Sequence, residues 1–153
     1  MILKNLDKIA NKIRIDIIQE ISAAGSGHPG GSLSIVEILC SLYFGGVLNF
    51  DSKNPHDPKR DRFIMSKAHC CPALYAVFYE LGLIKRAELL TLRKFGSRLQ
   101  GHPDRQKFDL IETSGGSLGQ GLSIACGMAL SAKLDGLKYK TFVLMSDGEQ
   151  EEG

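Results

Sequence analysis

The sequence has no long hydrophobic run and no concentration of charge of one sign. No apolar stretch approaches the ~20 residues that a membrane-spanning helix needs, and residues 1–4 lead into an amphipathic pattern rather than a signal peptide. The 19 basic and 17 acidic residues are spread along the chain, so the net charge of +2 does not indicate nucleic-acid binding. These absences predict a soluble, cytoplasmic protein that binds neither nucleic acid nor membrane.

Paired cysteine motifs are absent as well. The four cysteines, Cys40, Cys70, Cys71 and Cys126, form no CxxC pair and no zinc-finger spacing, which predicts reduced and mostly buried thiols. The run His69-Cys70-Cys71 raises the question of a metal site, but side chains that are neighbours along a chain seldom converge on one ion. Small apolar residues at the start of a helix are the simpler interpretation.

The composition is that of an ordinary globular domain. Hydrophobic residues make up 43% of the 153 residues and charged residues 24%, which excludes disorder, collagen and coiled coil. The length suffices for one domain with a hydrophobic core.

The apolar pattern predicts both helices and strands. Residues 6–21 carry leucine or isoleucine at every third or fourth position, which is typical of an amphipathic helix. Ser34 and Glu37 have the spacing of a capping box, and an almost wholly apolar helix over 35–44 is expected to be buried. The remaining predictions are a loop over 49–61, a strand over 62–66, and helices over 72–81, 86–95 and 122–134.

The segment 141–153, which reads TFVLMSDGEQEEG, predicts a binding site. Its apolar run at 142–145 is typical of a strand buried on both faces of a parallel sheet. Ligands of such sheets bind beyond the carboxyl ends of the strands, where Asp147 and Gly148 follow. Asp147 offers a hard oxygen ligand for Mg²⁺ or Ca²⁺, and Gly148 lets backbone N–H groups approach a phosphate. A plain polar turn after the strand is the alternative.

Two glycine-rich loops indicate further binding positions. The loop TSGGSLGQG at 113–121 opens into a helix, and a helix N-terminus offers backbone donors to an anion. It lacks the lysine of a Walker A loop and the later acid of a dinucleotide fingerprint, and close helix packing is the alternative role for its glycines. The loop at 23–32 surrounds His28 with glycines, and its Gly-His-Pro step recurs around His102.

The histidines have alternative roles as well. His69 follows the strand predicted over 62–66 and precedes a helix, and a side chain there reaches a ligand at the carboxyl edge of the sheet. Capping of that helix is the alternative. A loop histidine such as His28 is often only solvated, although the glycines beside it favour a function.

Taken in order, five motifs resemble the opening segment of transketolase, a thiamin-diphosphate enzyme: SGHPGGSLS, RDRFIMSKAH, FGSRLQGHPD, SGGSLGQGLS and SDGEQEEG. The resemblance covers the chain from Ser22 to Gly153 and implies an α/β fold, part of a thiamin-diphosphate-binding fold with a parallel sheet flanked by helices. Two positions depart from the family pattern. Ser146 stands where the metal motif usually has glycine, and Ser117 replaces a proline common in many members.

The same resemblance implies roles for individual residues. Asp147 matches the aspartate that binds the divalent metal. The family's catalytic histidines match His28, His69 and His102, of which His69 lies between cofactor and substrate while the other two line the substrate channel. The cofactor-binding positions match His69, Gly116, Ser117, Leu118, Gly148 and Glu149, and Glu152 matches a buried glutamate near the dimer interface.

By this resemblance, residues 1–153 are the N-terminal part of the diphosphate-binding domain, without the pyrimidine-binding and C-terminal domains. The implied activity is transfer of a two-carbon ketol unit from a ketose phosphate to an aldose phosphate, in the pentose phosphate pathway, with thiamin diphosphate and Mg²⁺ or Ca²⁺. The expected assembly is a homodimer, or a heteromer with a chain that carries the remaining domains, and the chain alone is expected to be inactive. The alternatives are a fragment of a 1-deoxyxylulose-5-phosphate synthase-like enzyme and a non-catalytic subunit or relic that keeps the fold.

Overall fold

The computed structural model describes residues 2–152, which form α-helices and a parallel sheet. The chain divides into two compact units, and each is built from two separate stretches of sequence. Met1–Leu48 with His69–Gly101 form the helical unit, and Asn49–Ala68 with His102–Gly153 form the sheet unit.

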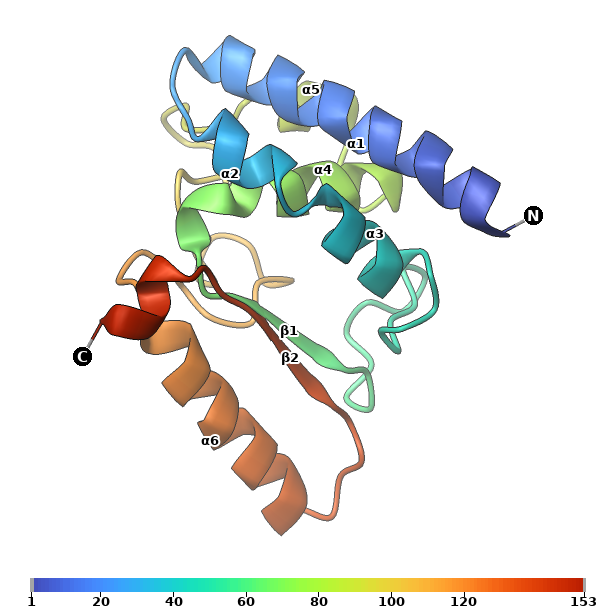
Figure 1. Cartoon of the computed structure of the whole chain (residues 1–153), viewed down its shortest axis with the longest axis vertical. Helices are drawn as coiled ribbons and strands as arrows, with labels where there is room; N and C mark the ends of the chain where they lie inside the picture. The colour runs from blue at the N-terminus through green and yellow to red at the C-terminus, as the bar shows by residue number, and fades with distance from the viewer. Residues whose placement is uncertain (1, 153) are drawn as a thin grey trace. The chain divides into compact units, whose positions relative to one another are not determined.

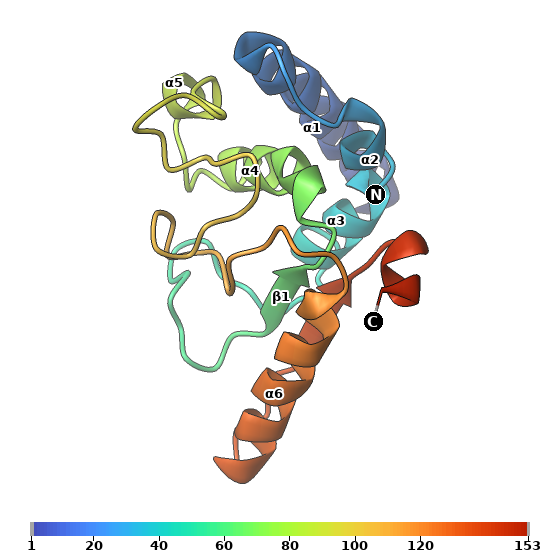
Figure 2. The same ribbon diagram turned by 90° about the vertical axis from the view of Figure 1, so that its left-hand side faces the viewer.

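The helical unit contains five α-helices within the described residues: α1 (Ile2–Ala24), α2 (Pro29–Leu33), α3 (Val36–Tyr43), α4 (Cys71–Glu80) and α5 (Arg86–Leu89). Helix α1 packs against both α3 and α4 (Figure 1; Figure 2). The predicted amphipathic helix is confirmed, because Ala10, Ile13 and Ile17 are buried along one face of α1. Full burial of one isoleucine contributes about 1.5–3 kcal/mol, so this face holds the unit together.

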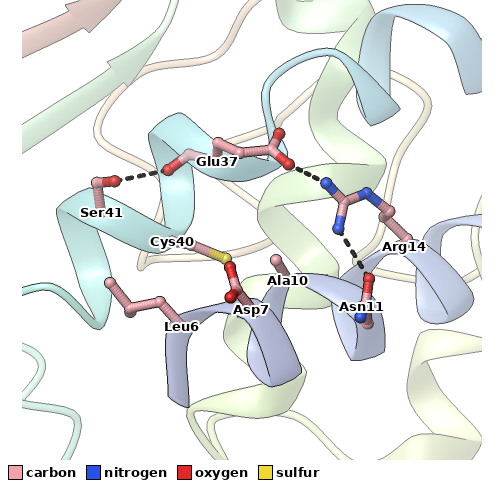
Figure 3. Close-up of a pocket in the computed structure, with 8 residues that line it drawn as sticks. All are labelled: Leu6, Asp7, Ala10, Asn11, Arg14, Glu37, Cys40 and Ser41. Carbon is pink, nitrogen blue, oxygen red and sulfur yellow. Dashed lines mark hydrogen bonds and ion pairs between the residues drawn. The ribbon is translucent and has the colours of Figure 1, made fainter. Parts of the chain in front are cut away.

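The predicted capping box of α3 is wrong. The Ser34 hydroxyl donates to the Gly31 carbonyl oxygen at 2.8 Å, and Ile35 is the N-cap of α3 without a side-chain hydrogen bond. Glu37 instead forms an ion pair with Arg14 of α1 (Figure 3). The tertiary ion pair therefore takes the carboxylate that the capping box needed. The helix is also not wholly buried, since Ile38 is 47% exposed.

Helix α5 is shorter than the helix predicted over 86–95. Leu89 and Leu92 are buried as expected, but Phe95 is fully exposed. The backbone of Arg93 has a positive φ of 61°, and its N–H donates to the Leu99 carbonyl oxygen at 2.9 Å. Helix α5 has already ended at Leu89, and the left-handed backbone of Arg93 keeps the following residues from resuming a helix in spite of the leucine pattern.

The sheet unit contains the parallel pair β1 (Arg62–Met65) and β2 (Thr141–Leu144), in a register that places Ile64 beside Val143. Helix α6 (Gln120–Leu134) packs along both strands (Figure 1). The 3₁₀ turn η1 (Ala68–Cys70) follows β1, and η2 (Gly148–Glu151) follows β2. Both predicted strands and their parallel pairing are thus confirmed.

Burial in the sheet unit differs from the prediction. Leu144 is buried, but Phe142 and Val143 are only half-buried, because β2 has β1 on one side and no further strand on the other within the described residues. Gly121, Ala125 and Ala132 are the buried residues of α6, and these small side chains let the helix approach the strands closely.

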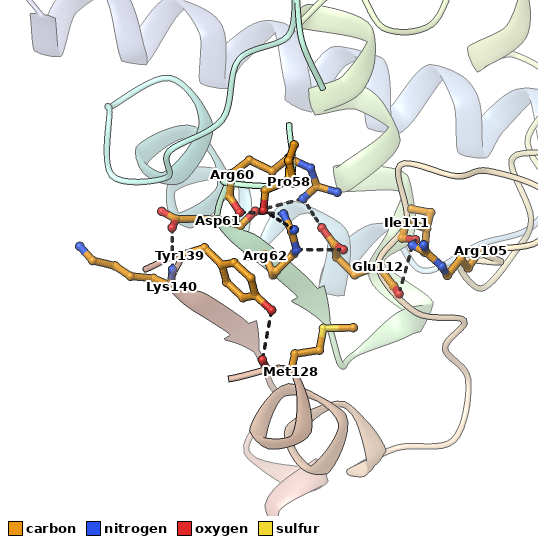
Figure 4. A network of polar contacts seen from close by, with 10 residues as sticks. All are labelled: Pro58, Arg60, Asp61, Arg62, Arg105, Ile111, Glu112, Met128, Tyr139 and Lys140. Atoms are coloured by element: carbon orange, nitrogen blue, oxygen red, sulfur yellow. Dashed lines mark hydrogen bonds and ion pairs between the residues drawn. The ribbon is translucent and has the colours of Figure 1, made fainter. Parts of the chain in front are cut away.

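A polar network fixes the start of both strands (Figure 4). The Asp61 carboxylate accepts hydrogen bonds from the backbone N–H groups of Asn49, at 2.9 Å, and of Lys140, at 2.7 Å. The Arg62 guanidinium lies over the Tyr139 ring at 4.5 Å from its centroid. These contacts join the residues just before β1 to those just before β2, so they set the strand register.

Other predictions concern cysteines and membranes. None of the four cysteines forms a disulfide bond, and Cys40, Cys70 and Cys71 are buried while Cys126 is exposed, which confirms mostly buried thiols. None of the helices in residues 2–152 has the length and apolar character required to cross a membrane.

Candidate functional site

The glycine-rich loop of the sheet unit lies tightly against its surroundings. The Gly115 N–H donates to the Pro103 carbonyl oxygen at 2.9 Å, and a Cβ at Gly115 would lie 2.6 Å from the Cβ of Ala68. Gly119 has a φ of +82° and forms the N-cap of α6. Both positions therefore require glycine, one for the close approach and one for its left-handed backbone.

His102 lies beside this loop. A Cβ built on Gly116 would be 3.7 Å from the Cγ of the His102 ring. The His102 side chain is exposed, and the following Pro103 is buried. The second Gly-His-Pro step thus places an accessible imidazole next to the glycine-rich loop of the same unit.

Glu149 connects the loop to the ends of both strands. It is 1% exposed, and its Oε1 accepts hydrogen bonds from the Ser66 hydroxyl at 2.6 Å and the Gly119 N–H at 3.1 Å. Its Oε2 accepts from the Ser146 N–H at 2.8 Å and from the Ser146 hydroxyl at 3.4 Å. Burial alone would raise the pKa of Glu149, but these hydrogen bonds outweigh it and hold the pKa below its ordinary value of 4.5.

Asp147 and Gly148 lie exposed at the turn after β2. Within residues 2–152, no side chain or N–H group hydrogen-bonds the Asp147 carboxylate, and no group of three His, Cys, Asp or Glu residues converges to hold a metal. A Cβ at Gly148 would meet nothing within 4 Å. The packing of the described residues therefore gives no reason for glycine here, whereas close approach of a ligand would.

A pocket of about 550 Å³ lies between the glycine-rich loop and the turn after β2. Its lining includes Ser117, Leu118 and Gly119 from the loop, and Met145, Glu149 and Gln150 from the end of β2 and η2. The N-terminus of the 15-residue helix α6 begins at this pocket. The first turn of a helix has backbone N–H groups without intrahelical partners, and it carries the positive end of the helix dipole.

This donor set fits a diphosphate with a divalent cation. Backbone N–H groups at a helix N-terminus bind phosphate oxygens. Asp147 does not line the pocket itself, but it lies in the turn between the lining residues Met145 and Glu149 and can supply one carboxylate there. Mg²⁺ is usually held by one or two carboxylates together with phosphates and water, so a full cage of protein ligands is not required.

His28 and His69 lie together in the helical unit. Their ring centroids are 5.1 Å apart at an interplanar angle of 61°. His28 is the N-cap of α2, so the loop predicted over 23–32 is partly helical. A Cβ at Gly31 would lie 2.7 Å from Cys70 Sγ and 3.6 Å from His69 Nε2, which shows how closely α2 approaches η1.

The predicted residues thus fall into two groups. The histidine pair belongs to the helical unit, while His102, the glycine-rich loop and the turn after β2 belong to the sheet unit. Glu152 is exposed in the described chain. Sequence reasoning missed Ser66, whose only signal was its position at the end of a predicted strand.

A second pocket, of about 330 Å³, lies between α1 and α3 and includes none of the predicted site residues (Figure 3). Arg14 closes one side of it by donating to Asn11 Oδ1 at 3.0 Å and pairing with Glu37.

Comparisons with known proteins agree with the motifs. The family described as "Transketolase, thiamine diphosphate binding domain" matches residues 6–153. Human transketolase is 47% identical over 99% of this chain and 24% of its own length. One subunit of an apulose-4-phosphate transketolase, from Phocaeicola vulgatus, is 44% identical over 100% of this chain and 54% of its own.

Solved structures give the same result. Transketolase from Leishmania mexicana superposes with a TM-score of 0.88 at 33% identity, over 97% of this chain and 24% of that one. The chain therefore spans about a quarter of the length of these transketolases and about half of the Phocaeicola vulgatus protein. The resemblance seen in the five motifs is confirmed, and the chain belongs to the transketolase family, in its thiamine diphosphate binding domain.

Proposed function

We propose that this chain is the N-terminal part of the diphosphate-binding domain of a transketolase, which transfers a two-carbon ketol unit from a ketose phosphate to an aldose phosphate. The observation that carries the proposal is the pocket at the N-terminus of α6, which the glycine-rich loop lines together with Met145 and Glu149, the residues that flank the exposed Asp147 turn in sequence. The family match over residues 6–153 supports it.

In this proposal, backbone groups of Gly116, Ser117, Leu118 and Gly148 hold thiamin diphosphate, and Asp147 binds its Mg²⁺ or Ca²⁺. The bound cofactor supplies the nucleophilic carbon that the ketose carbonyl requires. Ser117, in place of the family's common proline, keeps a backbone N–H that proline lacks, so the loop loses no donor.

The histidines move protons and stabilise charge on oxygen. We assign this role to His28, His69 and His102, because an imidazole can both donate and accept a proton. His69 is half-buried against His28, which restricts its ring, whereas the exposed His28 and His102 are accessible to substrate.

The partner and the compartment are part of the same proposal. A homodimer, or a heteromer with a chain that supplies the remaining domains, would complete the active site in the cytoplasm. The 44% identity to one subunit of the Phocaeicola vulgatus transketolase supports the heteromer.

Two measurements on protein purified from its native source test the proposal. Its intact mass shows whether this sequence is the whole polypeptide or a part of one. Ketol transfer between sugar phosphates, with thiamin diphosphate and Mg²⁺, is the expected activity of the complete assembly. Product formation from pyruvate and glyceraldehyde phosphate would instead support the synthase-like alternative, and neither activity would support a non-catalytic role.

Variants then test the residues. Asp147→Ala should abolish metal-dependent binding of thiamin diphosphate in calorimetry, because the carboxylate that anchors the cation is gone. Glu151→Ala, an exposed carboxylate in the same turn, is the matched control and should bind normally. His28→Ala should keep cofactor binding and slow turnover by about 10²–10⁴-fold. Normal activity of both Asp147→Ala and His28→Ala would contradict the assignment.

A further inference from the structure

We propose that Glu149 is a positioning residue, whose buried carboxylate holds the glycine-rich loop and the Asp147 turn in the geometry that binds thiamin diphosphate. This inference rests on the proposed function and changes the role that the resemblance implied for Glu149. The resemblance placed it among the cofactor contacts, whereas the structure surrounds its carboxylate with protein donors.

The first step is that neither oxygen of Glu149 is available to a ligand. The side chain is 1% exposed, and each oxygen already accepts at least two hydrogen bonds. A carboxylate also repels a diphosphate at close range, so direct contact would weaken binding. We therefore assign the carboxylate the role of fixing the loop and the turn whose other backbone groups face the cofactor.

The second step is the hydrogen bond to Gly119. This residue directly follows Leu118, the last of the predicted cofactor-binding positions in the loop, and caps α6. Accepting the Gly119 N–H satisfies one N-terminal donor of the helix and fixes the path of the loop that precedes it. A Cβ at Gly119 would lie 3.3 Å from the Glu149 carbonyl oxygen, so η2 and the loop are in close contact.

The third step is the pair of hydrogen bonds from Ser146. Ser146 precedes Asp147, and its N–H and hydroxyl both reach Oε2 of Glu149. The carboxylate thereby closes the turn that presents Asp147. The hydroxyl contact also explains how serine is accommodated where the family motif usually has glycine, because a glycine could contribute only its N–H.

The fourth step is the hydrogen bond from Ser66 at the end of β1, 83 residues away in sequence. It anchors Glu149 to a strand rather than to another loop. Rigid support of this kind sets the precision of a binding site, and its loss in metal sites typically costs 10–100-fold in affinity or activity.

The experiment compares Glu149→Ala with Glu149→Gln and Ser66→Ala in the complete enzyme, assembled with all its chains. Calorimetric titration with thiamin diphosphate in Mg²⁺ should show affinity reduced about 10–100-fold for Glu149→Ala. Glu149→Gln should lose less affinity for thiamin diphosphate, because its amide oxygen can still accept hydrogen bonds from Ser66 and Gly119. Ser66→Ala should also weaken binding, although Ser66 has no assigned cofactor contact. Glu151→Ala is the control and should bind as the wild type does.

Two further readouts separate positioning from a merely structural role. Hydrogen exchange of the cofactor-free Glu149→Ala protein should increase at the loop 116–119, with exchange in α1 unchanged. At saturating cofactor, the KM for the sugar phosphates should stay within about twofold of wild type, because Glu149 does not act on substrate. Unchanged cofactor affinity in all three variants would overturn the proposal. Failure of the wild type itself to bind thiamin diphosphate would instead overturn the proposed function.

Discussion

Two glycines of α6 provide a matched test of how the helix packs on the strands. Each glycine is replaced by alanine in a separate variant. In a helix interior, alanine is more favourable than glycine by up to about 1 kcal/mol of helix propensity. A Cβ at Gly127 meets nothing within 4 Å, so Gly127→Ala should stabilise the protein by about 0.5–1 kcal/mol. A Cβ at Gly121 would lie 2.5 Å from both Cβ and Oγ of Ser66 and 2.8 Å from its Cα.

The clash at Gly121 cannot be relieved by rotating one side chain, because the Ser66 Cα belongs to the backbone next to β1. Forcing an extra methyl into such a site costs about 1–3 kcal/mol. Gly121→Ala should therefore be less stable than Gly127→Ala by about 1–3 kcal/mol, since the propensity gain at Gly121 is at most equal. It should also weaken the bond from Ser66 to Glu149.

Urea unfolding of the two variants gives the difference in free energy of unfolding, and hydrogen exchange over α6 shows where it arises. Equal stability of the two variants, or greater stability of Gly121→Ala, would refute the packing described for α6 and β1.

Three further predictions concern the helical unit and the thiols. Glu20 is fully buried, and no described residue hydrogen-bonds either carboxylate oxygen, so Glu20→Met should raise the free energy of unfolding by about 1–3 kcal/mol at neutral pH. Burial, and the nearby acidic charge on α1, raise the folded-state pKa of Glu20 above its ordinary value of 4.5, so wild-type stability falls as pH rises above that value. The advantage of the variant should therefore shrink in acid, where the carboxyl group is protonated. Gly31→Ala should destabilise the protein by about 1–3 kcal/mol, because the added methyl group would clash with Cys70. Gly30→Ala lies on the same helix, but its methyl group would meet nothing within 4 Å, so this control should not be destabilised. Thermal unfolding of both variants should show a lower melting temperature for Gly31→Ala alone. Peptide mapping after brief alkylation of the native protein should find Cys126 modified before the three buried cysteines, and equal labelling would contradict their burial.

Much of the fold is predictable from the local sequence. The period of α1, the proline at the start of α4 and the two apolar strands are local signals, and the structure confirms them. The glycines at 115 and 119 were predicted to matter, and close approach and a left-handed backbone now account for them.

The rest depends on partners that lie far away along the chain. Glu37 had the spacing of a capping residue, but Arg14, 23 residues earlier, takes its carboxylate. Glu149 followed a metal motif, and its carboxylate accepts a hydrogen bond from Ser66, 83 residues earlier. No local pattern encodes such pairs, because they form only when elements distant in sequence lie side by side, two helices for Glu37 and the ends of two strands for Glu149.

The way the two units alternate along the chain has a consequence for synthesis on the ribosome. All of the helical unit has been translated once residue 101 is made, because its two stretches end there. The sheet unit cannot form until its last residues are made, because β1 at residues 62–65 pairs with β2 at 141–144. The Asp61 carboxylate likewise accepts a hydrogen bond from the backbone N–H of Lys140, 79 residues later. During that interval the nascent chain carries an apolar strand without its partner, which is a state prone to aggregation. Vectorial synthesis thus favours early folding of the helical unit, and β1 is the segment that a ribosome-associated chaperone would have most reason to shield.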